Sequence, residues 1–369
     1  MAPQDGLRIE TVVIGAGITG LSTALFLARA GREVMVLDRG DPWGESSGGN
    51  AGTLSLQVKH PLVLDLMQLS LDLWEAEAGS RDLGYERTGG VRVALSQEEV
   101  VMLKKSVALQ QRHGYGFDYL EGKALHRAVP WLGPGVLAAS LSPRDAFSSP
   151  LRCGPQLLRA VSEAGVDIVD HREVQAIEPD GGYRLVTPAG AIRCDIVVIA
   201  AGVWSGHISA MLGVELPLMV DVNMLTITEP VDHVLDRVVT HIGGVLSLKQ
   251  YPNGTCMIGG GWQGKGNPES GTKELDYEQL LHNLRIAARV VPGLRQLRIL
   301  RSWSGFESVA PDALPVLGRL PGREGVFIAT GARGGYSLGP AQGMLLSEMI
   351  ARDHTTLPAD PFDPARLVS

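Results

Sequence analysis

The sequence lacks the cysteine patterns that mark metal centres and disulfide-stabilised proteins. Its three cysteines, Cys153, Cys194 and Cys256, are far apart, and no two of them form a C-x-x-C pair. Scattered thiols do not favour an iron–sulfur cluster, a zinc site or a disulfide framework. They are typical of buried or idle thiols in a reducing compartment, so we expect a cytoplasmic protein without a metal ion.

Two further absences narrow the class of protein. No stretch approaches the unbroken run of about 20 apolar residues that a membrane span needs, and residues 1–10 are too polar for a secretory signal. The formal net charge is −7, and an excess of negative charge disfavours binding to nucleic acid or anionic membranes. We therefore expect no nucleic-acid partner and no membrane span.

Glycine is what the chain has in excess. With 369 residues, of which 44% are apolar and 20% are charged, it is long enough to bury a large core and to form two domains. The 46 glycines exceed ordinary usage. They cluster in short loops rather than in a low-complexity tract, and these loops carry the motifs that follow.

The most informative motif comes directly after the first apolar strand. The β-branched run Thr11-Val12-Val13-Ile14 leads into Gly15-Ala16-Gly17-Ile18-Thr19-Gly20, and an apolar helical stretch follows at residues 21–30. A second strand at residues 33–37 then ends at Asp38. In this strand–turn–helix–strand setting a G-x-G-x-x-G hexamer indicates a dinucleotide site. The alternative is a glycine-rich turn in an ordinary α/β protein.

Each glycine of this hexamer has a physical reason, and so has the acidic residue that follows it. Gly15 permits the tight turn, Gly17 lets the backbone approach a pyrophosphate, and Gly20 lets the helix pack closely on its strand. Free N–H groups and the helix dipole favour an anion at the helix N-terminus. Asp38 follows Gly20 by 18 residues, where a carboxylate can accept hydrogen bonds from a ribose hydroxyl.

Two later segments are also rich in small residues. Residues 46–53 could lie against a flat ligand or form a mobile surface loop. Near the end of the chain, a strand at 326–329 is followed by the glycine-rich residues 330–336 and by a helix at 340–351. Two strand–loop–helix units suggest a nucleotide cofactor held at both ends, with its phosphates at the first loop and its ring system at the second.

The hydrophobic pattern predicts the remaining elements. It places helices at residues 61–78, 97–113, 154–164 and 277–291. Short strands are expected at 166–169 and 174–177, a hairpin at 183–187 and 191–194, and a doubly buried parallel strand at 196–201. Alternating segments between residues 216 and 262 predict an antiparallel sheet with a turn at 252–254.

Taken in order, these motifs resemble one known family. The chain is similar to the FAD-dependent amine oxidoreductases that include D-amino-acid oxidase, glycine oxidase and sarcosine oxidase. The likeness covers essentially the whole chain and rests on residues 15–20 with Asp38 and Arg39, 46–53, 200–204, 259–262, 311–318 and 329–340. Most members carry Glu where this chain has Asp38, and the shorter carboxylate is compatible with the ribose contact.

The resemblance implies an α/β fold of the D-amino-acid oxidase type. Its Rossmann-like FAD-binding domain would be discontinuous and would combine residues 1–85, 145–215 and 300–369. An antiparallel-sheet α+β substrate domain would take residues 86–144 and 216–299.

The resemblance also implies FAD as the cofactor and a set of contacts to it. The first glycine loop would hold the pyrophosphate, Asp38 the adenosine ribose, and the backbone of Val174 the adenine side. The 46–53 loop would line one edge of the flavin, and N–H groups of residues 331–338 would stabilise negative charge at the other edge. The implied cofactor residues are Gly15, Ala16, Gly17, Ile18, Thr19, Gly20, Asp38, Arg39, Ser46, Ser47, Gly48, Asn50, Ala51, Gly52, Thr53, Val174, Ala201, Gly202, Trp204, Gly331, Arg333, Gly334, Gly335, Tyr336 and Ser337.

Some positions depart from the family pattern. Several relatives tether their flavin through Cys or His, but Gly305 and Gly49 stand at those places, which implies a non-covalent FAD. Oxidases of the sarcosine kind use a lysine near the flavin to activate oxygen, and Met257 stands there. A thioether cannot stabilise superoxide as a cation does, which favours a dehydrogenase.

The substrate contacts are less defined. Glycine-oxidase-like members bind the substrate carboxylate with an arginine, and the corresponding residue here is Glu307. Either another cation binds the acid group, or Glu307 meets the substrate amine. The candidates are the cations Lys249 and Arg333, with Gln250 and Tyr336 as hydrogen-bonding groups. Each of them could instead be a solvated or structural residue.

Within the family the chain most resembles the beta subunit of multi-subunit proline and 4-hydroxyproline dehydrogenases. This implies oxidation of a cyclic secondary amino acid, with cis-4-hydroxy-D-proline favoured and D- or L-proline next. Partner subunits of a hetero-oligomer would carry further flavin or iron–sulfur centres. Two alternatives stay open: a free-standing glycine, sarcosine or D-amino-acid oxidase that makes hydrogen peroxide, and a flavin-binding subunit with no substrate of its own.

Overall fold

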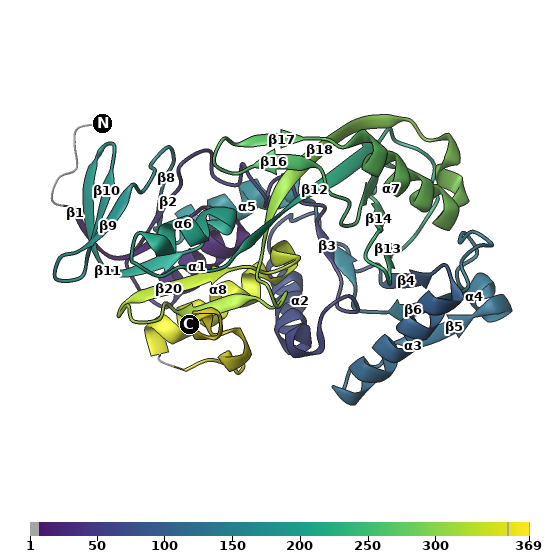
Figure 1. Ribbon diagram of the computed structural model, residues 1–369, viewed down its shortest axis with the longest axis horizontal. Coiled ribbons are helices and arrows are strands. Elements are labelled where there is room, and N and C mark those ends of the chain that lie inside the picture. Colours follow the sequence, from purple (N-terminus) through teal and green to yellow (C-terminus); the bar gives the residue numbers. More distant parts are fainter. Residues whose placement is uncertain (1–6, 353, 369) are drawn as a thin grey trace.

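The structure is a computed structural model and describes residues 7–352 and 354–368. Most of its chain is organised around a mainly parallel sheet and a mainly antiparallel sheet, which lie toward opposite ends of the view in Figure 1. Residues 1–6 of the polar start predicted at 1–10 lie outside the described part of the chain.

Apolar, β-branched segments build the parallel sheet. Its path runs through β19 (Val316–Arg319), β20 (Val326–Thr330), β11 (Gly190–Ile199), β1 (Leu7–Ile14), β2 (Val34–Leu37) and β8 (Asp167–Val169). Neighbours from β20 to β8 are parallel, so the carboxyl ends of these strands share one edge. The strands β10 (Tyr183–Thr187) and β9 (Ala176–Pro179) extend from β11 as an antiparallel ribbon.

One predicted pair of strands is a single strand in the structure. The sequence pattern separates residues 191–194 from 196–201, but β11 runs through both without a break. Its first half pairs with β10, and its second half lies between β1 and β20. Asp195 interrupts the apolar pattern without interrupting the extended backbone, so the two predicted segments join.

Helices cover both faces of the parallel sheet. On one face α1 (Ile18–Arg29), α2 (Leu64–Ala78), α5 (Pro150–Glu163) and α8 (Gly335–Arg352) share a hydrophobic core with Val13, Val36 and Val198. On the other face Val12, Val197 and Ile199 pack with α6 (Ser205–Ala210) and the β9–β10 ribbon. The central strands are therefore buried on both sides, as their continuous apolar runs predict.

The second sheet is antiparallel except at one pair. Its order is β18 (Ile299–Val309), β12 (Met219–Thr228), β15 (Cys256–Gly259), β14 (Ser247–Gln250), β13 (Val238–His241), β4 (Gly90–Ala94), β6 (Ala138–Ser142) and β5 (Asp118–Glu121). The exception is β13–β4, which is parallel. The helices α7 (Tyr277–Val290) and α4 (Gly122–Ala128) pack on one face, and α3 (Gln97–Arg112) contacts β4 and β6. The antiparallel sheet predicted between residues 216 and 262 is confirmed, with residues 252–254 between β14 and β15.

Smaller elements complete the fold. The strand pairs are β3 (Thr53–Leu54) with β7 (Ala146–Phe147) and β16 (Lys265–Asn267) with β17 (Thr272–Glu274). The 3₁₀ turns are η1 (Pro61–Val63), η2 (Gly202–Trp204), η3 (Pro292–Gln296), η4 (Asp360–Phe362) and η5 (Pro364–Leu367).

Two helices begin earlier than the sequence predicts. The helix α5 starts at Pro150 rather than at residue 154, because proline is well suited to the first helical position. The helix α8 starts at Gly335 rather than at residue 340, so Pro340 lies inside it. Tertiary contacts hold this first turn: Ser70 Oγ and Trp74 Nε1 of α2 donate hydrogen bonds to Ser337 O at 2.6 and 3.2 Å.

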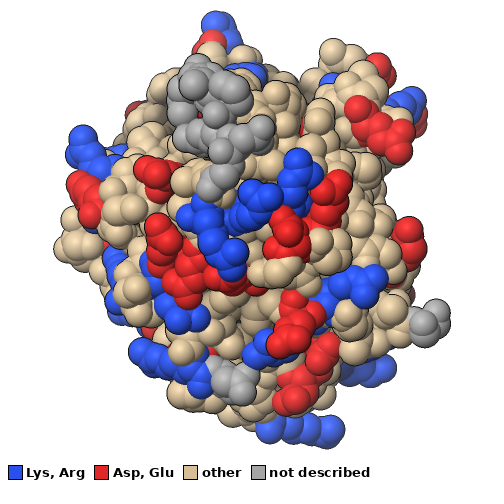
Figure 2. All heavy atoms as spheres, turned by 90° about the vertical axis from the view of Figure 1, so that its left-hand side faces the viewer, with Lys and Arg blue, Asp and Glu red and all other residues tan. Residues whose placement is uncertain are grey.

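Charged side chains of both signs are mixed over the face drawn in Figure 2, with no broad region of one sign. This view looks onto the end of the molecule that carries β9 and β10 in Figure 1. Ion pairs there include Arg184 with Glu178 at 2.6 Å and Arg193 with Asp180 at 2.7 Å. Such exposed pairs contribute little to stability, and they leave the face electrostatically balanced.

The observed arrangement confirms the predicted α/β fold class with a discontinuous Rossmann-like part and an antiparallel sheet. The exact division into domains remains a prediction. The boundary placed at residue 300 divides β18, a strand that pairs with β12 in the antiparallel sheet.

Candidate active site

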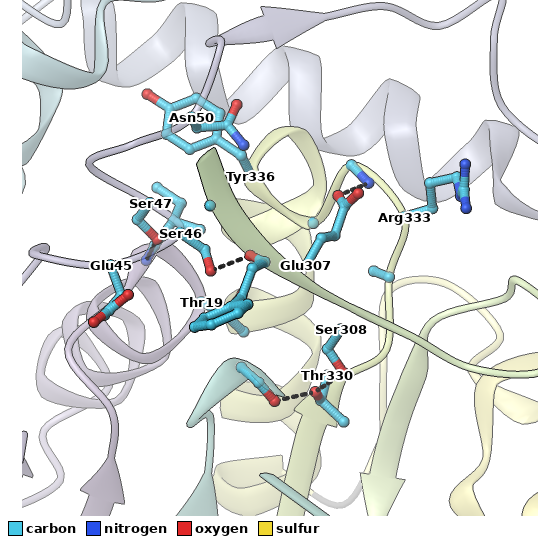
Figure 3. A pocket seen from close by; sticks show the side chains of 18 of the residues that line it. Thr19, Glu45, Ser46, Ser47, Asn50, Glu307, Ser308, Thr330, Arg333 and Tyr336 are labelled. Carbon is cyan, nitrogen blue, oxygen red and sulfur yellow. Dashed lines mark hydrogen bonds between the residues drawn. The ribbon is translucent and has the colours of Figure 1, made fainter. Parts of the chain in front are cut away.

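A cavity of about 640 Å³ is lined by residues from both sheets. The parallel sheet contributes the carboxyl ends of its strands, through Ile14, Leu37, Ala200 and Thr330. Ligands of such sheets bind at this edge. The antiparallel sheet contributes the opposite wall through β4, β12, β13 and β18. Figure 3 shows how side chains from both parts of the chain converge on this space.

The first glycine loop forms one end of the cavity. Gly15 has φ +109°, and a Cβ on it would lie 2.4 Å from Ala200 O. A Cβ on Gly20 would lie 1.9 Å from Gly15 O. Only glycine fits these two positions, so the loop is held tightly between β1 and α1. Gly17 is the N-cap residue of α1, and the first turn of the helix carries no acidic side chain, which leaves this terminus suited to an anion.

Asp38 fastens this loop to the end of β2. Its Oδ2 accepts a hydrogen bond from Ala16 N at 2.7 Å, and its Oδ1 accepts one from Gly40 N at 2.9 Å. Burial raises the pKa of Asp38, and the two backbone hydrogen bonds oppose that rise. Each carboxylate oxygen has a second lone pair and Asp38 lines the cavity, so the predicted ribose contact is compatible with this geometry.

The 46–53 loop bridges the two sheets at the middle of the cavity. Ser46 Oγ donates to Phe306 O at 2.5 Å, and Trp303 Nε1 donates to Gly49 O at 2.9 Å. Ser47 Oγ accepts a hydrogen bond from Ile18 N at 2.9 Å. The loop is therefore tied to β18 on one side and to the first glycine loop on the other (Figure 3).

Glu307 faces the cavity from β18 beside the second glycine loop. Its Oε1 accepts a hydrogen bond from Gly334 N at 2.6 Å, and its Oε2 accepts one from Asn223 Nδ2 at 2.7 Å. Burial raises the pKa of Glu307, while these hydrogen bonds and the cations Arg333 and Lys59 lower it. The carboxylate is thus held in one orientation. The Gly334 N–H, which the resemblance directs at the flavin, is already used here.

Two other predicted substrate residues, Arg333 and Tyr336, already have partners within the protein. Arg333 Nη2 pairs with Asp221 Oδ2 at 2.6 Å, and its side chain points away from Glu307 in Figure 3. Tyr336 lies in the cavity wall, but its hydroxyl pairs with Ser148 Oγ at 2.8 Å. Its ring lies 5.3 Å from that of Trp74. These contacts favour a structural function for the Tyr336 side chain.

Gln250 requires a correction because it lies outside the cavity wall. Its Oε1 accepts a hydrogen bond from Val234 N at 2.8 Å, and its Nε2 donates to Asp232 O and Gly254 O at 3.0 and 3.1 Å. The amide is used to fasten two backbone segments together. A direct contact with substrate is not supported.

Lys249 is fully buried behind the wall. Its Nζ donates to Thr53 Oγ1 at 2.6 Å, and Thr53 Oγ1 also pairs with Ser247 Oγ at 2.9 Å. Burial lowers the pKa of Lys249 to about 7. Lys249 lies directly opposite Met257 in the β14–β15 pair. The β14–β15 pair therefore places a lysine beside Met257, one hydroxyl away from the cavity.

Sequence reasoning missed a polar row on the antiparallel sheet. Ser140, Arg92, Thr240 and Ser247 stand opposite one another on β6, β4, β13 and β14. Arg92, Thr240 and Ser247 line the cavity, and so does Lys59. The alternation of Arg92 with the fully buried Val91 and Val93 could have signalled that this arginine faces the other side of the sheet.

The comparison with known proteins identifies the family. A family model described as FAD dependent oxidoreductase (DAO) matches residues 10–349. The chain belongs to this family. The resemblance noted from the sequence motifs is thereby confirmed, and the chain is an FAD-dependent oxidoreductase.

Several members are similar over nearly their whole length. Glycine oxidase of Geobacillus kaustophilus is 27% identical over 372 residues, which are 97% of both chains. Sarcosine oxidase subunit beta of Rhodobacter capsulatus is 26% identical over 97% of this chain and 89% of its own. The crystal structure of L-proline dehydrogenase from P. horikoshii has a TM-score of 0.88 and 27% identity, covering 98% of each chain.

The cavity fits FAD. It reaches from the first glycine loop to the second. Side chains on Gly15 or Gly20 would clash with the backbone oxygens of Ala200 or Gly15, so only glycine allows the tight cradle at the phosphate end. The predicted cofactor residues found in its wall are Gly15, Gly17, Ile18, Thr19, Asp38, Arg39, Ser46, Ser47, Asn50, Ala51, Thr53, Val174, Ala201, Gly202, Trp204, Gly331, Arg333, Gly334, Gly335, Tyr336 and Ser337. Ala16, Gly20, Gly48 and Gly52 are not part of the wall and support it from behind. Their individual contacts with FAD remain predictions.

Two negative findings apply to the described residues alone. Within residues 7–352 and 354–368, no group of three or more His, Cys, Asp or Glu side chains is arranged to hold a metal ion. In the same part of the chain, no helix combines the length and the apolar character needed to cross a membrane.

Proposed function

We propose that this chain is an FAD-dependent dehydrogenase of a cyclic secondary amino acid. cis-4-Hydroxy-D-proline is the favoured substrate, followed by D- or L-proline. The observation that carries the proposal is the fixed carboxylate of Glu307, which faces the cavity beside the second glycine loop. An acceptor in this position suits the N–H of an amine. The similarity to L-proline dehydrogenase over 98% of both chains supports the same substrate class.

The residues of the cavity would orient the substrate. FAD, when bound, supplies the acceptor for the two electrons and the hydrogen that leave the carbon beside the substrate nitrogen. Glu307 would accept a hydrogen bond from the substrate N–H and thereby fix the nitrogen. In a cyclic amine the ring keeps the nitrogen lone pair and the neighbouring C–H in a fixed relation, so fixing one positions the other.

Lys249 and Thr53 could hold the proton that the substrate nitrogen loses. The Thr53 hydroxyl lines the cavity and contacts Lys249 Nζ at 2.6 Å. Since burial lowers the pKa of Lys249 to about 7, this amine can accept a proton near neutral pH. The walls formed by both sheets would keep bulk water away from the bound amine.

We also propose that the FAD is held without a covalent bond and that the chain acts as the catalytic beta subunit of a hetero-oligomer. Gly49 and Gly305 offer no side chain for a tether, and the three cysteines are buried. The similarity to sarcosine oxidase subunit beta supports the subunit assignment. Partner subunits would then pass electrons onward through further flavin or iron–sulfur centres. A cytoplasmic location is part of the same proposal.

One observation favours a second function, that of a free-standing amino-acid oxidase. Lys249 Nζ contacts the hydroxyl of Thr53, which lines the cavity. Lys249 also lies directly opposite Met257, the residue that stands at the position of the oxidase lysine. When protonated, Lys249 could stabilise an anionic oxygen species. Hydrogen peroxide formation by the purified chain would then accompany turnover.

The test is anaerobic mixing of the purified, FAD-loaded chain with single amino acids. The proposal predicts that cis-4-hydroxy-D-proline or a proline bleaches the flavin much faster than glycine or sarcosine. With oxygen as the only electron acceptor, a dehydrogenase should form little hydrogen peroxide. A free-standing oxidase should instead form hydrogen peroxide at the rate of turnover. If no imino acid bleaches the flavin, the proposal is wrong, and a flavin subunit without its own substrate is favoured.

A further inference from the structure

The cations that line the cavity differ in how much of their charge is already paired. In the described wall they are Arg39, Lys59, Arg92, Arg172 and Arg333. Arg333 is paired with Asp221 at 2.6 Å. The Arg39 guanidinium stacks on the Trp204 ring, 3.6 Å from its centroid. Arg172 also has a buried donor without a partner, Nη1, but it belongs to the end of the cavity near Asp38, whose carbonyl accepts the Arg172 backbone N–H at 2.7 Å. Lys59 and Arg92 are therefore the cations left to meet a substrate.

Lys59 is directed toward Glu307 and its loop. Its Nζ lies 3.4 Å from both Arg333 O and Gly334 O. Burial lowers the pKa of Lys59 to about 8, and the nearby charge of Glu307 opposes that fall. The positive charge of Lys59 thus compensates the negative charge of the Glu307 carboxylate. An amine bound to Glu307 would lie close to Lys59.

Arg92 offers an unused donor at another part of the wall. Its Nη1 donates to Gln57 O at 2.7 Å and to Ser106 Oγ at 3.1 Å, which fixes the plane of the guanidinium. Its Nε is buried and has no hydrogen-bond partner in the described structure. A buried donor without a partner is costly and rare, and it is satisfied when a ligand supplies an acceptor.

A second unpartnered polar atom stands beside it. Thr240 lies directly opposite Arg92 in the β13–β4 pair, and its side chain also lines the cavity. Thr240 Oγ1 is buried and lacks a partner among the described residues, and the residue is 5% exposed. Two residues that line the cavity from adjacent strands therefore each carry a buried polar atom without a partner.

We propose that Arg92 and the hydroxyl of Thr240 bind the carboxylate of the substrate, while Glu307 takes the amine. The assignment rests on the proposed function and deepens it, because it defines the substrate class as an amino acid with a free carboxylate. The arginine that relatives use at the place of Glu307 is replaced by one on a different strand. The acid group is then met by another strand of the same sheet, β4 in place of β18.

Buried groups around Arg92 hold its side chain in place and keep it charged. Burial lowers the pKa of Arg92 to about 10, so the guanidinium stays protonated at neutral pH, and Asp145 favours the charged form. Asp145 is itself buried and accepts hydrogen bonds from Ser55 Oγ and from Leu56 N. Gln57 O, which receives the Arg92 bond, also accepts one from Gln110 Nε2 at 2.8 Å. The carboxylate-binding group is thus carried by a buried network.

The test uses two planar ligands that cannot be oxidised as proline is: pyrrole-2-carboxylate and pyrrole-2-carboxamide. Their binding to the FAD-loaded chain is measured by calorimetry. The wild type should prefer the carboxylate. Arg92→Gln should weaken carboxylate binding about 10- to 100-fold, the range for a lost charged hydrogen bond, and should change carboxamide binding by less than about threefold. Thr240→Val should weaken carboxylate binding by about fivefold.

Arg112→Gln is the matched control, because it makes the same change at an exposed arginine of α3 that does not line the cavity. It should keep the carboxylate preference. Unchanged carboxylate binding in Arg92→Gln would overturn the assignment. If Arg92→Gln does not fold, unchanged carboxylate binding in Thr240→Val would overturn it instead.

The two proposals fail in different ways. If an imino acid bleaches the wild-type flavin while Arg92→Gln binds the carboxylate normally, the function stands and the Arg92 assignment falls. If Arg92→Gln loses carboxylate binding but no imino acid bleaches the wild type, the carboxylate site stands and the proposed function falls.

Discussion

The carboxylate of Glu307 accepts a hydrogen bond of 2.6 Å from the backbone N–H of Gly334. This bond joins the last strand of the antiparallel sheet to the loop that leads into α8. In the β12–β18 pair, Glu307 lies directly opposite Asp221, which holds Arg333 of the same loop. The second glycine loop is therefore positioned by the antiparallel sheet as well as by the strand that precedes it.

Replacing Glu307 by Gln should weaken amine binding while leaving FAD in place. The amide keeps the size of the side chain but removes the charge that would attract the substrate N–H. We expect KM for the imino acid to rise about tenfold, with a smaller change in kcat. Steady-state kinetics measure this, with the exposed Glu269→Gln as the control. An unchanged KM in Glu307→Gln would rule out the amine contact.

The same variant should change the pH dependence. Burial raises the pKa of Glu307 above its ordinary 4.5, so the wild type loses the carboxylate as pH falls through that raised value. The part of the acidic limb of kcat/KM that belongs to Glu307 should therefore lie above pH 4.5 in the wild type and be absent in Glu307→Gln, whereas a loss near pH 7 from protonation of Lys249 should remain in both enzymes. The profile of both enzymes between pH 4 and 8, measured with an acceptor that is insensitive to pH, decides the point.

Gly17→Val should abolish FAD binding. A Cβ on Gly17 would lie 3.0 Å from Ser47 Oγ, and the rest of the valine side chain would occupy the approach of the pyrophosphate. Gly116→Ala is the control, because its Cβ would meet nothing within 4 Å. The FAD content after purification and after reconstitution measures the effect. A normally yellow Gly17→Val protein would contradict the position given to the phosphates.

Lys249→Met should stabilise the protein near neutral pH. Burial lowers the pKa of Lys249 from 10.5 to about 7. Between these values the unfolded chain binds a proton that the folded chain does not, so wild-type stability rises with pH. The advantage of Lys249→Met in the urea midpoint should be largest at pH 7 and should shrink toward pH 10. The exposed Lys265→Met should show no such trend, and a constant difference for Lys249→Met would refute the lowered pKa.

Ser70→Ala and Trp74→Phe should act non-additively on stability. Both side chains donate to the same carbonyl, Ser337 O, at 2.6 and 3.2 Å. Each single variant leaves the other donor in place and should cost about 1 kcal/mol. The double variant removes both and should cost about 1 kcal/mol more than the sum. A double-mutant cycle of the free energies of unfolding in urea checks this. If the losses in the two single variants simply add up in the double variant, the two hydrogen bonds to Ser337 O are energetically independent, and the prediction is wrong.

The sequence by itself determined the local units of the fold. The run Thr11 to Gly20 specifies a strand, a tight turn and a helix through β-branched residues and glycines, and the structure contains these elements. The doubly buried second half of β11, predicted as a separate strand at 196–201, and the antiparallel sheet were likewise evident from their apolar patterns. Such features follow from neighbours along the chain, which is why the FAD end of the cavity could be predicted from motifs.

Tertiary structure alone decided which side chains meet across the cavity. Gln250 and Lys249 are adjacent in sequence, yet one fastens backbone segments outside the wall and the other touches Thr53. Arg92 and Thr240 stand opposite each other only because β4 and β13 pair in parallel, nearly 150 residues apart in the chain. Register between distant strands depends on the packing of the whole sheet, and no local pattern encodes it. The substrate end of the cavity is therefore a property of the fold.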